Sequence, residues 1–221
     1  MYTIAALYTG KGGLGEMIRQ ELCSLMDDVI VEEIIDSELL NRVIADNGVT
    51  KSTIRRVLRL FDSAVEAGAD MILCTCSSIG AAAEVAQQIY DIPVVRVDAA
   101  MVNEAVKNYE KIAVVATLPT TLGPTTDFLK KTAREMSKTV HITEVVAEGA
   151  FSQVKQGNII KHNELIVSAA EALEDVQAII LAQASMMSVR EQIEKATGLP
   201  TLASPRMCAE QIARQRGILK H

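Results

Sequence analysis

Short apolar runs of strand length alternate with amphipathic stretches along the whole chain, which has 221 residues. In the amphipathic stretches the apolar residues recur at helical spacing, which predicts helices between the strands. This alternation is typical of parallel sheets that carry helices on both faces, so we predict an α/β fold with doubly wound parallel sheets. The predicted strands are Tyr2 to Tyr8, Val29 to Ile35, Met71 to Cys74, Ile92 to Val97, Lys111 to Ala116, Thr139 to Val146, Ala178 to Ala182 and a last strand that begins at Pro200.

Capping and turn residues mark the ends of the predicted helices. Asp36 and Ser37 have the side chains that cap a helix N-terminus, and Gly217 is the type of residue that ends one. The threonine-rich stretch from Thr117 to Thr121 follows a predicted strand and is predicted as a loop, equivalent to the stretch from Gly10 to Gly15 in the first half. The predicted helices are Leu14 to Met26, Ser37 to Ala45, Ser52 to Glu66, Gly80 to Tyr90, Ala99 to Tyr109, Thr126 to Ser137, two stretches that flank Gly157 and Asn158, and Arg206 to Arg216.

The two halves of the chain resemble each other at a nearly constant offset. The period is too long for a solenoid repeat and suits two similar α/β lobes. We predict a first lobe over residues 1–98 and a second over 99–204, with the segment from about 205 to 221 able to pack back on the first. Related by a pseudo-twofold axis, the lobes would enclose one active-site cleft. The pairs that match at an offset of 107 are Pro93 with Pro200, Cys76 with Gln183, and Ser78 with Ser185.

Small polar residues follow the buried strand from Met71 to Cys74. A strand that delivers such residues to a helix is where open α/β folds bind and transform their ligands. Ser77 or Ser78 would cap the helix. Its free amides and dipole would favour the thiolate of Cys76. The alternative is that Cys76 is only a small residue of the core, as free cysteines often are.

Several short motifs resemble the Asp/Glu/hydantoin racemase superfamily. In that family Gly-Ala-Asp, an apolar run and Cys-Asn-Thr follow one another, and here Gly68 to Asp70 precede the run and Cys76-Ser77-Ser78. Thr117 and Thr120 match a family loop, Ala-Thr-x-x-Thr, that helps to hold substrate carboxylates. The resemblance implies a cofactor-independent racemase or isomerase that acts on a small carboxylate. It implies catalytic roles for Cys76 and Gln183, and substrate contacts from Thr9, Ser77, Ser78, Thr117, Thr120 and Ser185.

The second half departs from the family pattern. Relatives have Gly-Cys-Thr at the end of this strand, where the present chain has Ala182-Gln183-Ala184. Family racemases use two cysteines, one on each face of the substrate, and Gln183 has no proton to exchange. With one thiol, isomerisation or decarboxylation fits the chemistry better than two-base racemisation. Gln183 would donate a hydrogen bond to a substrate oxygen, or else only cap the helix of Met186. We interpret Cys74, two residues before Cys76, as a core residue.

A glycine-rich loop offers a second functional hypothesis. Gly10 to Gly15 matches the G-x-G-x-x-G pattern between a strand and a helix, and Glu32 or Glu33 lies where a ribose-binding acid would belong. The alternative function is therefore an NAD(P)-dependent enzyme, and a third is a carboxylate-binding module without catalysis. Lys11 would pair with a substrate carboxylate or remain a solvated surface residue.

Composition and charge exclude several classes of protein. The net charge of −6 argues against a nucleic-acid partner. The apolar runs are too short to cross a membrane. Four cysteines, at positions 23, 74, 76 and 208, and three scattered histidines give no metal-site spacing. The chain opens on an apolar strand without an export signal, so we expect a cytoplasmic protein without disulfides. Its apolar helices are compatible with a homo-oligomer.

Overall fold

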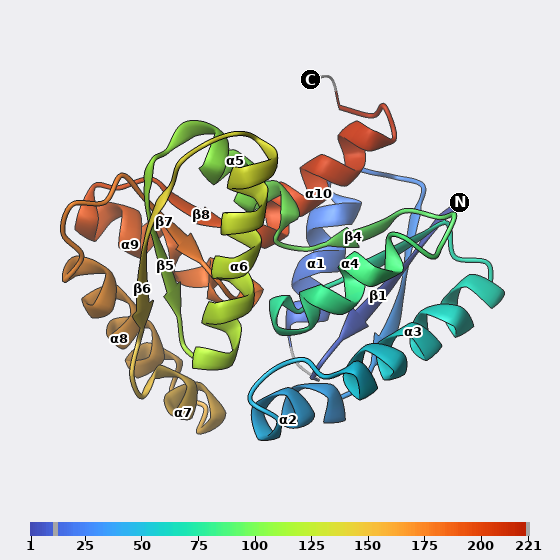
Figure 1. Cartoon of the computed structure of the whole chain (residues 1–221), viewed down its shortest axis with the longest axis horizontal. Coiled ribbons are helices and arrows are strands. Elements are labelled where there is room, and N and C mark those ends of the chain that lie inside the picture. The colour runs from blue at the N-terminus through green and yellow to red at the C-terminus, as the bar shows by residue number, and fades with distance from the viewer. Residues whose placement is uncertain (11–12, 220–221) are drawn as a thin grey trace. The chain divides into compact units, whose positions relative to one another are not determined.

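Parallel pairing of short apolar strands builds the first sheet of the protein. The computed structural model describes residues 1–10 and 13–219, and Figure 1 traces the chain. Strands β1 (Tyr2–Tyr8), β2 (Val29–Ile35), β3 (Met71–Cys74) and β4 (Val94–Arg96) form a four-stranded parallel sheet in the order β2-β1-β3-β4. The inner strands β1 and β3 are largely buried, which agrees with their continuous apolar sequences.

The second sheet repeats this arrangement later in the chain. Strands β5 (Lys111–Ala116), β6 (His141–Val146), β7 (Ala178–Leu181) and β8 (Thr201–Ala203) pair in the order β6-β5-β7-β8, again all parallel. Helices cover both faces of each sheet (Figure 1). The prediction of two similar doubly wound α/β lobes is therefore confirmed. The helices are α1 (Leu14–Cys23), α2 (Glu38–Ala45), α3 (Lys51–Glu66), α4 (Gly80–Ala86), α5 (Ala99–Asn108), α6 (Pro119–Glu135), α7 (Ala150–Lys155), α8 (Ile159–Glu171), α9 (Arg190–Thr197) and α10 (Ser204–Gln215).

Equivalent backbone hydrogen bonds show how closely the two sheets correspond. The N–H of Thr75 donates to Leu7 at 3.2 Å, and 107 residues later the N–H of Ala182 donates to Val115 at 2.9 Å. Likewise Ile72 donates to Pro93 and Ile179 to Pro200, each at 2.9 Å. Both prolines stand just before the edge strands β4 and β8, where a residue without an N–H is tolerated. The two halves thus share strand order, register and strand-end geometry.

The chain divides into two compact units. Unit 1 comprises Met1–Ala99 and Pro205–His221, and unit 2 comprises Ala100–Ser204. Helix α10 belongs almost wholly to unit 1, although 105 residues of unit 2 separate it from the rest of that unit. The chain therefore leaves unit 1, builds unit 2 and returns to finish unit 1.

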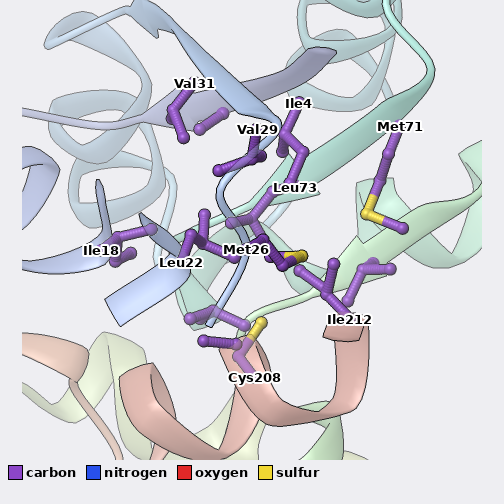
Figure 2. Close-up of a cluster of buried hydrophobic side chains, with 14 of the residues drawn as sticks. Ile4, Ile18, Leu22, Met26, Val29, Val31, Met71, Leu73, Cys208 and Ile212 are labelled. Carbon is purple, nitrogen blue, oxygen red and sulfur yellow. The ribbon is translucent and has the colours of Figure 1, made fainter. Parts of the chain in front are cut away.

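Two apolar layers hold unit 1 together, one on each face of its sheet. On one face, α1 and α10 pack against β1 and β3, and Figure 2 shows Cys208 and Ile212 of α10 among the side chains of this layer. On the other face, α2, α3 and α4 cover Leu7, Ile72 and Cys74. Alternate residues of the inner strands therefore point into different layers, as the pleat of a strand requires.

Helix α6 begins earlier than predicted. The helix begins at Pro119, seven residues before the predicted start at Thr126, and includes Pro124. Pro119 stands in the first turn, where its missing N–H would have no partner in any helix. The hydroxyl of Thr125 donates to the carbonyl of Thr121 at 3.0 Å within the same helix. The predicted loop from Thr117 to Thr121 is thus wrong beyond Leu118.

Candidate functional site

Cys76 lies just beyond the carboxyl end of β3, in the middle of the unit 1 sheet. It precedes a 3-10 turn, Ser77–Ile79, which continues into α4. The expectation that Ser77 or Ser78 caps α4 is wrong, because both lie inside the turn and Ile79 stands at the cap position without a side-chain cap bond. Ser77 and Ser78 are buried, with 7% and 1% of their surfaces exposed. We call residues 76–78 the first strand end.

The register of the sheet places Thr9 at the same level as the thiol. Leu7 of β1 pairs with Cys74 of β3, so Thr9 and Cys76 each follow this pair by two residues. Parallel strands end at the same edge of a sheet, and both residues are half-buried there. Thr9 and the first strand end therefore follow neighbouring strands at the same edge of the sheet.

The four cysteines differ sharply in their surroundings. Cys76 is partly exposed and Cys23 is exposed, whereas Cys74 and Cys208 are buried. Burial raises the pKa of the Cys74 thiol to about 12, and burial likewise raises the pKa of the Cys208 thiol to about 12. The interpretation of Cys74 as a core residue is confirmed by its place among the apolar side chains under α3 and α4. Of the two neighbouring cysteines, only Cys76 is accessible to a small molecule.

The position in unit 2 that is equivalent to Cys76 is occupied by Gln183. The side chain of Gln183 forms hydrogen bonds with Thr117. The Oε1 atom accepts the Thr117 N–H at 2.6 Å and lies 3.0 Å from the Thr117 hydroxyl. The Nε2 atom donates to the same hydroxyl at 2.8 Å. The alternative that Gln183 caps the following helix with its side chain is wrong, because no such cap bond forms and only its carbonyl accepts from Met186.

The remaining predicted residues of unit 2 fall in different environments. Thr120 lies in the first turn of α6, and its hydroxyl is a buried polar atom without a hydrogen-bond partner among the described residues. Ser185 is exposed, in the 3-10 turn Ala184–Val189 that follows β7. We call Thr117, Thr120, Gln183 and Ser185 the second strand end. Apart from Thr117 and Gln183, these side chains share no direct bond in the described part of unit 2.

Two threonine-to-valine substitutions test whether the Thr117 hydroxyl stabilises the fold, while the Thr120 hydroxyl does not. Thr117→Val should lower the free energy of unfolding by about 1–2 kcal/mol, because the Gln183 amide loses its partner. Thr120→Val, the matched control, should change it by less than about 0.5 kcal/mol, since it removes an unpaired hydroxyl. Urea denaturation of the two variants measures the difference. Equal losses of stability would contradict the hydrogen-bonding pattern described above.

The glycine-rich loop is described only in part, because Lys11 and Gly12 lie outside the described residues. Gly15, in the first turn of α1, is buried, and a Cβ atom there would lie 2.8 Å from Oε1 of Glu33. The same carboxylate forms an ion pair with Arg19 at 3.2 Å. The absence of a side chain at Gly15 therefore leaves room for Glu33, whose carboxylate is paired with Arg19 of α1.

Unit 1 also contains a cluster of charged residues, centred on buried Arg96, that the sequence pattern did not predict. Arg96, at the end of β4, is 3% exposed and binds Asp98 through Nε at 2.9 Å and Nη2 at 2.8 Å. Its Nη1 donates to Glu84 of α4 at 2.5 Å. Burial opposes the charge, but the two carboxylates outweigh it and raise the pKa of the Arg96 guanidinium. The signal that could have revealed the cluster is Arg96, which interrupts the apolar run from Ile92 to Val97, with Asp98 directly after the run.

Nowhere in 1–10 and 13–219 do three or more histidine, cysteine or carboxylate side chains gather in a way that could hold a metal ion. Over the same residues no helix combines the length and apolarity needed to cross a membrane.

Comparison with known proteins identifies the relatives of this chain. The model of the family described as Asp/Glu/hydantoin racemase matches residues 17–212. A glutamate racemase from Bacillus anthracis superposes with a TM-score of 0.76 at 18% identity, over 99% of this chain and 84% of that one. An allantoin racemase from Klebsiella pneumoniae gives 0.67 at 14% identity, over 99% and 89% of the two chains. A glutamate racemase from Francisella tularensis, in complex with D-glutamate, gives 0.72 at 18% identity, over 100% and 83%. A search of curated proteins finds no match.

Proposed function

The chain belongs to the Asp/Glu/hydantoin racemase family, and from this premise we propose that it is a cofactor-independent isomerase acting on a small carboxylate through one thiol, that of Cys76. The observation that carries the proposal is the contrast between the two strand ends. The first has a partly exposed cysteine, whereas the equivalent position of the second is a glutamine bonded to Thr117. Unit 2 contains no cysteine at any position.

Cys76 is assigned the role of acid and base. As a thiolate it would remove a proton from the carbon beside the substrate carboxylate, and the electron pair of the broken C–H bond would pass into an enediolate. The resulting thiol then holds the proton. Returning it to the same carbon from the same side restores the starting configuration, so one thiol alone cannot invert that carbon. Returning it to a different carbon gives an isomer.

The second strand end is assigned the role of binding the developing negative charge. The Gln183 amide nitrogen carries two hydrogens, and the bond to Thr117 uses one of them. The second amide hydrogen would donate to a substrate oxygen, and the hydrogen bonds between Thr117 and Gln183 would keep the amide oriented. Thr120 supplies a hydroxyl that is unpaired among the described residues. The proposal assigns Thr9, Ser77, Ser78, Thr117, Thr120 and Ser185 to contacts with the substrate.

The same arrangement fits a second reaction, decarboxylation, because it too needs only one proton donor. The bond between the carbon and the carboxyl group would break, CO2 would leave, and the Cys76 thiol would protonate the carbon that keeps the electron pair. Solvent water then restores the thiol proton. The two reactions differ in whether CO2 is released.

Exchange with solvent deuterium tests the proposal. A panel of small amino-, hydroxy- and unsaturated carboxylates is incubated with the protein in D2O and followed by proton NMR. Conversion to an isomer, with or without deuterium at the receiving carbon, supports the isomerase, and CO2 release with one deuterium gained identifies the decarboxylase. Saturable binding of a carboxylate without conversion would instead support a binding module. If NAD(H) or NADP(H) raises the melting temperature and none of the carboxylates does, the result would support the dinucleotide enzyme.

The pH dependence of alkylation provides a test that needs no substrate. We expect iodoacetamide to modify Cys76 faster than exposed Cys23 at neutral pH, because the proposed chemistry requires a reactive thiol at Cys76. Cys74 and Cys208 should stay unmodified up to about pH 10, since burial raises the pKa of both thiols to about 12. Peptide mass spectrometry after timed quenching gives each rate. A Cys76 as unreactive as Cys74 would contradict the proposed role of its thiol.

A further inference from the structure

The cluster formed by Arg96, Asp98 and Glu84 has no part in the chemistry described so far. Arg96 and Asp98 are 3% and 1% exposed, so neither can reach a substrate from solvent. All three residues belong to unit 1, and they come from three consecutive pieces of its chain: α4, the end of β4, and the link to α5. The cluster therefore ties together the elements around the first strand end.

The position of Arg96 relates it directly to the cysteine strand. Arg96 pairs with Cys74 in the parallel register of β3 and β4, so its side chain points to the same face of the sheet as Cys74. On that face it reaches α4 and binds Glu84 in the second half of the helix. The bidentate contact with Asp98 fixes the plane of the guanidinium, which a lysine could not do.

Gly80 is the point at which this guanidinium touches the chain that carries Cys76. A Cβ atom on Gly80 would lie 2.6 Å from Nη2 and 2.8 Å from Nε of Arg96. The backbone of Gly80, with φ −55° and ψ −32°, is one that any residue adopts. Glycine is therefore required here for space alone, because the guanidinium occupies the position that a Cβ atom would need.

Only the 3-10 turn separates Gly80 from the thiol. Ile79 donates its N–H to the Cys76 carbonyl at 3.2 Å, which closes the turn between the two residues. Because this hydrogen bond and the one from the Gly80 N–H to the Ser77 carbonyl make the turn rigid, a displacement of Gly80 would also displace Cys76. Buried ion pairs contribute little net stability compared with apolar residues of similar volume, so stability alone gives no reason for this cluster.

We propose that Arg96, held by Asp98 and Glu84 and packed against Gly80, is a positioning residue that sets the place of the Cys76 thiol. The inference rests on the proposed function of Cys76 and extends it to residues that never touch the substrate. It requires that a change confined to the contact between Arg96 and Gly80 alters the reactivity of a side chain four residues away.

Gly80→Ala is the main test, because it keeps every charge and only adds a methyl group where the guanidinium lies. We expect the iodoacetamide rate of Cys76 to change by about fivefold or more, while that of exposed Cys23 stays within about twofold. Gly123→Ala is the matched control, since a Cβ atom there meets nothing within 4 Å and the rates of both cysteines should be unchanged. Thermal unfolding confirms that each variant is folded.

Arg96→Lys provides a second test, which can still be carried out if the Gly80→Ala variant fails to fold. It retains the positive charge between the two carboxylates but loses the planar fork, so the Cys76 rate should again change by about fivefold or more. Once a substrate is known, both variants should lower kcat by roughly tenfold or more and leave KM nearly unchanged. A folded variant in which Cys76 reacts within about twofold of the wild-type rate would overturn the positioning role.

The outcomes also separate this inference from the proposed function. A wild-type Cys76 as unreactive as Cys74 contradicts the proposed function and the positioning role together. A reactive Cys76 whose rate is the same in wild type, Gly80→Ala and Arg96→Lys overturns the positioning role alone and leaves the proposed function standing.

Discussion

Cys76→Ala should lower kcat on any substrate of this protein by about 100- to 10,000-fold, the range that a general acid or base contributes. Cys76→Ser should be almost as inactive, because a serine hydroxyl at the same place is a far weaker base than a thiolate. Turnover is measured by proton NMR on the substrate found in the deuterium screen. Both variants should keep the fold, since Cys76 is only partly buried.

Cys23→Ser is the control for this experiment. Cys23 is exposed at the end of α1 and has no role in the proposed chemistry, so its replacement should leave kcat and KM unchanged. Circular dichroism and thermal unfolding of all three variants exclude a loss of structure as the cause of inactivity. A fully active Cys76→Ala enzyme would overturn the catalytic role of the thiol and would favour the alternative of an NAD(P)-dependent enzyme that uses the glycine-rich loop.

Ile212→Ala should lower the free energy of unfolding by about 2–5 kcal/mol, the cost of removing a large side chain from a packed core. Ile212 is completely buried and lies in the layer that α10 forms with α1 and the sheet of unit 1 (Figure 2). Urea denaturation followed by circular dichroism measures the change. The effect tests whether the last helix is a structural part of unit 1.

Ile218→Ala is the matched control for Ile212→Ala. Ile218 is 43% exposed and follows the same helix, so its truncation should change the free energy of unfolding by less than about 0.5 kcal/mol. A loss of stability at Ile212 no larger than that at Ile218 would show that α10 is dispensable to the core of unit 1.

The strands were the part of the fold that the sequence predicted best. The bounds of β1, β2, β3 and β5 agree with their predictions, because these strands are rich in apolar and β-branched residues and are flanked by turn residues. The start of α6 was missed because Pro119 and Pro124 are typical loop residues, and only their places in the helix show that they are tolerated. The end of α4 was placed too late, since the apolar pattern continues past Ala86 into a turn.

Candidate residues were predictable by type, but their partners were not. A cysteine after a buried strand is visible in the sequence, as is the glutamine 107 residues later. The bond between Thr117 and Gln183 joins residues 66 apart and depends on the register of β5 and β7, which no local pattern specifies. The contact of Arg96 with Gly80 likewise depends on how α4 packs on its sheet.

The return of the chain to unit 1 has a consequence for the order of folding during synthesis. Unit 2 is one continuous segment, so all its residues are present before α10 has been made. The core of unit 1 lacks Cys208 and Ile212 until all of unit 2 has been synthesised. Domains made first usually fold first. Here one apolar face of the unit 1 sheet is covered only in part, by α1, while the later unit can already be complete. In that interval the uncovered part of this face is open to chaperones.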